Sequence, residues 1–180
     1  MISLKEATGI KHKQAETMPF NTRMFKGLLS KNEYLLYLDQ LLHIFLTIES
    51  KGLPHPGLNR AERVQADIDE LKSQGCTSGQ LTNSTRAYAD YLNALSYDEL
   101  LPHIYLNYMA IVFGGQIIKK SVPSSGKMYD FDYMQEAIKS IRDVQQDTWA
   151  GEVNRGFDFN ILMFEELETE CHNLRSAAAS

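Results

Sequence analysis

Apolar residues recur every three or four positions along most of this chain, the spacing of one buried face on an α-helix. No segment alternates apolar and polar residues with the period of two that a β-strand needs. The pattern therefore predicts an all-α, single-domain bundle of about six to eight helices. The predicted helices run from Ser3 to about Thr17, Ser30 to Ile48, Asn59 to Leu71, Ser84 to Leu95, Leu101 to Lys120, Tyr129 to Trp149 and Glu152 to Leu174.

The predicted helix boundaries carry recognisable signals. A Ser-x-x-Glu capping box, in which the two side chains satisfy each other's backbone amides, begins at Ser3, Ser30 and Ser96. Segments rich in proline, glycine or serine predict connectors at residues 19–27, 52–57, 73–79 and 122–127, and Gly151 is expected to interrupt the chain. We expect a helical domain over residues 1–175 and a disordered tail over 176–180.

The segment Leu101–Lys120 is long and mostly apolar, and two adjacent glycines, Gly114 and Gly115, lie within it. Each glycine inside a helix costs about 0.5–1 kcal/mol relative to alanine, and a pair is a common site for a kink. Glycine permits close approach of the backbone to another helix or to a flat ligand. The spacing alone leaves both interpretations open.

Composition excludes some classes of function and indicates the compartment. A net charge of −5 without a basic run argues against nucleic-acid binding. Cys76 and Cys171 lie far apart and outside any Cys-x-x-Cys motif, which suits a reducing compartment. The sequence has neither an apolar run of about 18 residues nor a signal-peptide pattern. We expect a cytoplasmic protein that does not enter a membrane.

Histidine supplies the candidate chemistry. His12 shares one predicted helix face with Leu4, Thr8 and Glu16, and it is either a surface histidine or a metal ligand. A second possibility is a di-metal site built from the pairs Asp39–His43 and Glu99–His103, each four residues apart. A lone histidine opposite a glycine-kinked helix suits a planar iron macrocycle.

Three segments resemble the heme oxygenase family. Residues 4–16, which include Leu-Lys-Glu-Ala-Thr and His-Lys-Gln-Ala-Glu, resemble its proximal helix. Residues 103–116, His-Ile-Tyr-Leu-Asn-Tyr-Met-Ala-Ile-Val-Phe-Gly-Gly-Gln, resemble its distal helix, and residues 156–167 resemble its last helix. The resemblance implies a heme-oxygenase-like fold that takes heme b as cofactor and substrate. Dioxygen and a reductant then convert heme to biliverdin, carbon monoxide and ferrous iron.

The resemblance also implies roles for single residues. His12 would be the proximal iron ligand, and Gly114 and Gly115 would let the distal helix bend over the ring. The other residues implied to contact the ring or its propionates are Lys5, Glu16, Tyr105, Ala110, Lys139, Arg142, Phe157, Asn160 and Phe164. Electrons would come from ferredoxin or a flavoprotein reductase, with candidate docking charges at Lys11, Lys13, Lys119 and Lys120.

The distal segment departs from the family pattern Gly-Asp-x-Ser-Gly-Gly-Gln. Ala110 replaces the first glycine, and Ile111 replaces the aspartate that holds proton-delivering water in the family. Isoleucine has no hydrogen-bonding group. Asn107 lies one turn earlier on a similar face and is the candidate to hold such water.

Two alternatives remain open from the sequence. Ile111, together with Asp132 and Glu136 near the expected propionate-binding positions, suits a heme-binding protein that lacks turnover. The Asp39, His43, Glu99 and His103 set suits a non-heme di-metal oxidase of the same fold.

Overall fold

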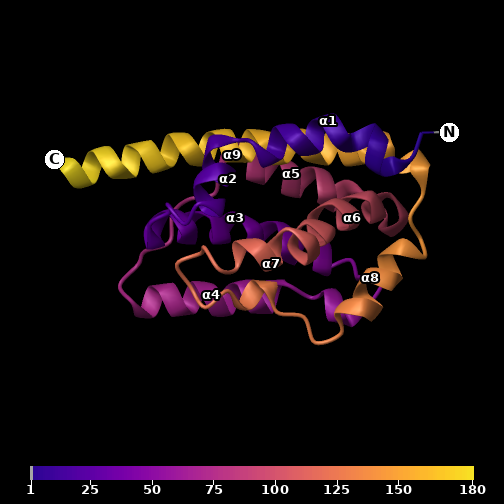
Figure 1. The fold of residues 1–180 in the computed structure, drawn as a ribbon, viewed down its shortest axis with the longest axis horizontal. Helices are drawn as coiled ribbons and strands as arrows, with labels where there is room; N and C mark the ends of the chain where they lie inside the picture. The colour runs from indigo at the N-terminus through magenta and orange to yellow at the C-terminus, as the bar shows by residue number, and fades with distance from the viewer. Residues whose placement is uncertain (1) are drawn as a thin grey trace.

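The computed structural model describes residues 2–180, and these residues form helices without a strand (Figure 1). The all-α prediction is therefore confirmed. The α-helices are α1 Leu4–Glu16, α2 Pro19–Phe25, α3 Lys31–Glu49, α4 Ala61–Ser73, α5 Asn83–Ala94, α6 Tyr97–Phe113, α7 Gly115–Ile118, α8 Met134–Arg142 and α9 Ala150–Ala179. Short 3-10 turns are η1 Pro56–Leu58, η2 Lys127–Tyr129 and η3 Asp147–Trp149.

Local capping sets several helix starts. Complete capping boxes occur at Ser30 with Glu33 and at Ser96 with Glu99, while at α1 the Ser3 hydroxyl accepts the amide of Glu6. The start of α4 differs from the prediction, because Asn59 does not cap it. The Glu49 carboxylate of α3 accepts instead from the backbone amides of residues 60 and 61, at 2.6 and 3.2 Å. This helix start therefore depends on a neighbouring helix.

Two predicted segments have different boundaries in the structure. The connector predicted over residues 19–27 contains α2, because Pro19 suits a first helical position and Phe20 and Met24 are buried. The single helix predicted from Tyr129 to Trp149 is divided into η2, α8 and η3. The apolar residues of this segment therefore lie on three short elements and do not form one continuous helix face.

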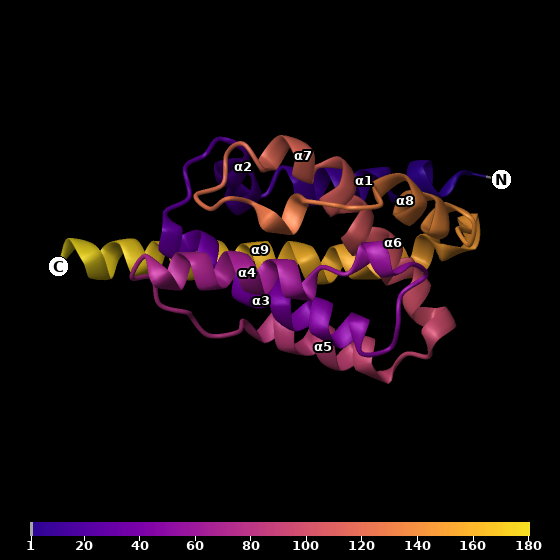
Figure 2. The ribbon, with the colours of Figure 1, turned by 90° about the horizontal axis from the view of Figure 1, so that it is seen from below.

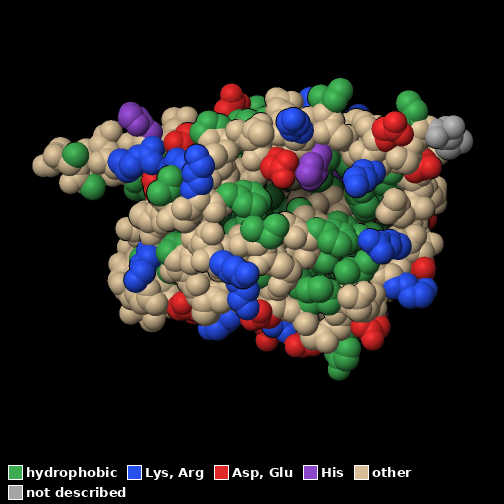
Figure 3. Space-filling view, viewed as in Figure 1, with side chains coloured by type: hydrophobic (Ala, Val, Ile, Leu, Met, Phe, Trp, Pro, Cys, Tyr) green, Lys and Arg blue, Asp and Glu red, His purple; other side chains and the backbone are tan. Residues whose placement is uncertain are grey.

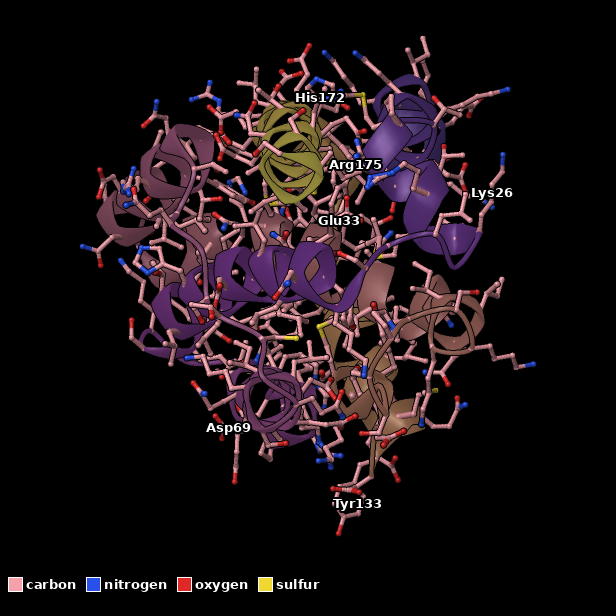
Figure 4. The ribbon with its side chains drawn as sticks, turned by 90° about the vertical axis from the view of Figure 1, so that its left-hand side faces the viewer. Lys26, Glu33, Asp69, Tyr133, His172 and Arg175 are labelled. Atoms are coloured by element: carbon pink, nitrogen blue, oxygen red, sulfur yellow. The ribbon has the colours of Figure 1, made fainter. Side chains whose placement is uncertain are left out.

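The last helix is longer than predicted. Gly151 does not interrupt α9, which continues through Ala179, so residues 176–179 of the predicted tail are helical. Alanine has the highest helix propensity, and the three alanines at 177–179 favour this extension. Just before them, Arg175 Nη1 lies 3.0 Å from the buried Glu33 Oε1, which also pairs with Arg23 at 2.9 Å (Figure 4).

The arrangement places α1 beside α9 along one edge of the molecule, with α4 along the opposite edge (Figure 1). Between them, α3 packs against both α4 and α5, and α6 packs against α9. Figure 2 shows α1, α2 and α7 on one side of α9 and α5 on the other. No helix within residues 2–180 combines the length and apolar character needed to span a bilayer.

Candidate functional site

A hollow with largely apolar walls opens between α1 and the α6–α7 pair (Figure 3). The α6–α7 side carries two large apolar side chains that remain half-exposed or more, Phe113 at 53% and Ile117 at 65%. Exposed apolar side chains of this size around a hollow are typical of a ligand-binding surface. The hollow therefore defines the candidate site.

His12 is the candidate nitrogen ligand on the α1 side. Its side chain is exposed, and its ring meets the buried Phe157 of α9 edge-on, with ring centroids 5.8 Å apart. No hydrogen bond within residues 2–180 engages its ring nitrogens. The exposed ring leaves both interpretations of His12 open, a surface histidine and a metal ligand, and its unbonded nitrogens are available to a ligand in the hollow.

The two adjacent glycines have different surroundings. A Cβ atom on Gly114 would make one tight contact, 3.1 Å to the Ala110 carbonyl oxygen of the preceding turn, and would meet no side chain within 4 Å. A Cβ atom on Gly115 would overlap Tyr129 Cδ1 and lie 2.9 Å from Cε1 of the same buried ring. Gly114 therefore suits close approach of a ligand, whereas Gly115 packs closely against Tyr129, and its expected role over the ring stays a prediction.

The helix predicted over this segment is interrupted at the glycines, because α6 ends at Phe113 and α7 begins at Gly115. The Gly114 amide still donates to the Ala110 carbonyl at 3.0 Å, as in a continuous helix. Ala110 itself is exposed one turn before the break. This end of α6 therefore presents a methyl group and bare backbone to the hollow.

The residue in the expected aspartate position belongs to the core. Ile111 is only 6% exposed and packs in the main apolar cluster. Asn107, 9% exposed, is the polar residue one turn earlier, and its Nδ2 donates to the Tyr88 hydroxyl at 3.0 Å and to the His103 carbonyl at 2.8 Å. Its Oδ1 lies 3.5 Å from Asn160 Nδ2 on α9. Asn107 and Asn160 are thus brought together from helices far apart in sequence.

Of the two basic candidates on α8, Arg142 is the better placed. Its guanidinium lies 5.8 Å from the centroid of the Phe113 ring at the end of α6. Lys139 instead pairs with Asp143 on its own helix at 2.5 Å. Lys5 is exposed on α1, and Tyr105 is half-buried with its ring 6.4 Å from Trp149. These positions leave Lys5, Tyr105 and Arg142 accessible to a carboxylate-bearing ligand.

The remaining predicted pocket residues differ in exposure. Phe164 is buried in an aromatic cluster, with its ring stacked 6.0 Å from Phe20 and 6.2 Å from Tyr37. Glu16 is exposed at the end of α1 beside a small hollow of about 200 Å³ next to α2. Phe164 thus contributes to the core beneath the site, and Glu16 lies on its rim.

The di-metal alternative does not fit the structure. Asp39 accepts from the Ser78 hydroxyl and the Gly79 amide, each at 3.0 Å, and Glu99 caps the start of α6. His103 is buried between Tyr88 and Glu152. Within residues 2–180, no three His, Cys, Asp or Glu side chains are placed to share a metal ion.

The polar residues around His103 were not assigned a role from the sequence. Tyr88 and Glu152 come from α5 and α9, and only the fold brings them to the two ring nitrogens of His103, at 2.8 and 3.1 Å. A histidine in an otherwise apolar helix was the one available signal, because a buried imidazole requires polar partners.

The residues around the hollow fit heme. An apolar iron macrocycle with carboxylate arms needs a nitrogen ligand, apolar walls and nearby cations. The site offers the unengaged imidazole of His12, the ring of Phe157 and the bare backbone of Gly114. Its accessible cations are Lys5 and Arg142. This fit rests on side chains from α1, α8 and α9 and on the backbone between α6 and α7.

Comparisons with known proteins agree with this interpretation of the site. Heme oxygenases of Pyropia yezoensis and Guillardia theta are 27% and 26% identical to this chain, covering 92% and 93% of it and 84% and 85% of their own lengths. The solved structure of heme oxygenase-1 from Synechocystis sp. PCC6803 in complex with heme shares the fold, with a TM-score of 0.78 at 23% identity. That match covers 98% of this chain and 95% of the other.

A second solved structure, heme oxygenase-2 from Synechocystis sp. PCC 6803 in complex with heme and NO, has a TM-score of 0.80 at 21% identity. It covers 97% of this chain and 86% of the other. The family model described as heme oxygenase matches residues 1–145, more than half of the sequence. The chain therefore belongs to the heme oxygenase family.

Proposed function

We propose that this protein binds heme b in the hollow between α1 and α6–α7 and cleaves it, with dioxygen and electrons, to biliverdin, carbon monoxide and ferrous iron. The observation that carries the proposal is the exposed and unengaged imidazole of His12 on α1, one wall of the hollow, together with the bare backbone of Gly114 at the α6–α7 junction, the other wall. Heme would supply both the iron that activates dioxygen and the ring that is oxidised.

Each wall of the site has a distinct task in this proposal. His12 Nε2 or Nδ1 would bind the iron, and Phe157 would hold the imidazole edge-on. Gly114 would let the backbone approach the ring, which restricts the open side to small ligands. Lys5 and Arg142 would pair with the propionates and fix the rotation of the ring, because cations near the hollow's mouth are accessible there.

Proton supply would depend on Asn107 rather than on a carboxylate. Its Oδ1 is the acceptor that could hold a water near the distal side, because Ile111 offers no polar atom. Water held by a neutral amide does not require a carboxylate to stay ionised, so its position should be insensitive to pH in the range where carboxylates titrate.

A redox partner such as ferredoxin or a flavoprotein would deliver the electrons. Among the lysines considered for docking, Lys11 pairs with Asp158 at 2.5 Å and Lys119 pairs with Asp130. Lys13 and Lys120 are exposed and make no ion pair within residues 2–180, so they are the preferred docking charges for an acidic partner.

The test begins with addition of hemin to the heme-free protein, which should produce a Soret band with saturable 1:1 stoichiometry. Adding a reductant and oxygen, with catalase to remove peroxide, should replace that band with biliverdin absorbance. Loss of the Soret band without biliverdin, or a Soret band that never forms, would refute the proposed function.

A second candidate is a heme-binding protein of this fold that does not turn heme over. The burial of Ile111 in the position of the family's aspartate favours it, because a water network centred on that position is excluded. Asp132 lies near an expected propionate-binding position, but it is acidic and pairs with Arg63 at 2.6 Å, so it cannot bind a propionate. A Soret band that persists under reductant and oxygen would establish this second function and exclude the first.

A further inference from the structure

A chain of hydrogen bonds connects the buried side chain of Asn107 with the protein surface. Asn107 Nδ2 lies 3.0 Å from Tyr88 Oη, which lies 2.8 Å from His103 Nδ1, and His103 Nε2 lies 3.1 Å from Glu152 Oε2. Tyr88 and His103 are almost fully buried, whereas the Glu152 side chain keeps 35% of its exposure. The chain therefore crosses α6, α5 and α9, and only its last member meets water.

The direction of each hydrogen bond follows from its partners. Burial lowers the pKa of His103, so the imidazole is neutral and carries one N–H. Burial acts to raise the pKa of Glu152, but the hydrogen bonds from Tyr91 and His103 outweigh it and lower that pKa, which leaves an acceptor-only carboxylate. His103 Nε2–H must then donate to Glu152, so Nδ1 is bare and accepts the Tyr88 hydroxyl proton.

This direction fixes the Asn107 amide. The single Tyr88 hydroxyl hydrogen is used in the bond to His103, so the Tyr88 oxygen can only accept a further bond, which it does from Asn107 Nδ2. The second Nδ2 hydrogen is committed to the His103 backbone carbonyl at 2.8 Å. A flipped amide would set its oxygen against two acceptors. Asn107 Oδ1 is therefore held on the opposite side, toward Asn160.

Gly156 on α9 makes room for this chain. A Cβ atom there would overlap Leu106 and lie 3.1 Å from His103 Nδ1 and 3.2 Å from Tyr88 Oη. The close approach of α9 to α6 at this glycine therefore seals the Tyr88–His103 hydrogen bond from water. A sealed hydrogen bond is stronger and better directed than an exposed one.

The fixed oxygen belongs to the helix stripe that faces the hollow. Asn107, Ala110 and Gly114 are three and four residues apart along α6, so they share one face. Ala110 is exposed, and a Cβ atom on Gly114 would meet no side chain within 4 Å. Asn107 Oδ1 accordingly lies at the inner end of the stripe that would meet the distal side of the ring.

We infer that Glu152, His103 and Tyr88 are positioning residues whose hydrogen-bond chain fixes Asn107 Oδ1 as an acceptor for a water on the distal side. This inference rests on the proposed function for the presence of the ring. In this inference the Glu152 carboxylate, at the surface of α9, sets the orientation of the Asn107 amide beneath the site. The chain would supply, at the neutral amide of Asn107, an acceptor that Ile111 cannot provide.

The orientation is tested first in the heme-free full chain by NMR of side-chain amides. We expect the Asn107 NH₂ hydrogens to exchange slowly, and Tyr88→Phe or His103→Leu to raise their exchange rate about tenfold, the effect of losing one hydrogen bond. Glu152→Gln keeps a carbonyl acceptor for His103 Nε2–H and should preserve the slow exchange, whereas Glu152→Ala should lose it. Tyr91→Phe keeps the aromatic ring and removes a hydroxyl that bonds Glu152 and Arg155 but neither Tyr88 nor Asn107, so it is the matched control.

The link to the distal side is tested spectroscopically on the hemin-loaded protein. The visible absorption spectrum is recorded across a pH titration, and its midpoint is the pH halfway between the low-pH and high-pH spectra. Tyr88→Phe and His103→Leu should shift this midpoint, and Tyr91→Phe and Glu152→Gln should not. The charged or titratable groups near His103 are Tyr88, Tyr91, Glu152 and Arg155, so the control variants also report any direct charge effect.

The outcomes separate this inference from the proposed function. A Soret band in every variant with unchanged Asn107 exchange in Tyr88→Phe would overturn the positioning chain while heme binding stands. Altered exchange without a shifted spectral midpoint would overturn its distal role. If hemin gives no Soret band with the parent protein, the proposed function and the distal role both fail.

Discussion

The adjacent glycines offer a matched pair of substitutions whose effects should separate packing from ligand binding. In Gly115→Ala the new methyl would overlap the buried Tyr129 ring, whose backbone carbonyl also accepts from Gln116 Nε2 at 2.8 Å. Overpacking of this kind costs about 1–3 kcal/mol, and replacing a helical glycine by alanine returns about 0.5–1 kcal/mol. The net loss should be about 0.5–2 kcal/mol.

Gly114→Ala is the comparison, because its methyl meets only the Ala110 carbonyl oxygen at 3.1 Å. Replacing a helical glycine by alanine should therefore leave the free energy of unfolding of Gly114→Ala unchanged or raise it by up to about 1 kcal/mol. If the ring lies beside Gly114, this methyl should weaken hemin binding in a protein that is fully folded. Gly115→Ala should bind hemin nearly as the parent does wherever it remains folded.

The assays are urea unfolding of the heme-free variants and hemin titration followed at the Soret band. For a chain of this length, the loss in Gly115→Ala corresponds to a fall in Tm of about 1–8 °C. The reasoning is refuted if Gly115→Ala is as stable as the parent, because Tyr129 would then be free to move. It is refuted equally if Gly114→Ala binds hemin with parental affinity.

Three further perturbations test other parts of the site. His12→Ala should abolish the native Soret band and change the free energy of unfolding by less than about 0.5 kcal/mol, because the side chain is exposed. Added imidazole should restore the band. The control is His172→Ala, which removes another exposed histidine and should behave as the parent. Arg142→Gln should weaken hemin binding by about 0.2–1 kcal/mol, measured by titration, and Lys139→Gln should have a smaller effect because Lys139 pairs with Asp143. Burial lowers the pKa of His103, so the unfolded chain binds a proton more readily, and stability present above about pH 6.5 should be lost as pH falls toward the folded pKa. Urea midpoints between pH 7 and pH 5 should fall less steeply for His103→Gln, and equal slopes would contradict this assignment.

Local sequence determined much of the fold. The three- and four-residue spacing predicted an all-α protein, and the Ser30 and Ser96 capping boxes predicted the starts of α3 and α6, because these signals act within one turn of helix. Boundaries set by distant groups were not predictable. The Glu49 carboxylate caps α4 from another helix, and Glu33 pairs with Arg175 where α9 continues toward Ala179.

For the site, the sequence by itself determined which residues stand in the family's pattern, including His12, the glycine pair and the substitutions Ala110 and Ile111. Only the tertiary structure decided that Gly114 has no side chain beside it while Gly115 packs on Tyr129, because adjacent helix positions point about 100° apart toward different neighbours. It likewise decided that Glu152 and Tyr88 meet His103, since such a hydrogen-bond chain joins helices that periodicity cannot place relative to one another.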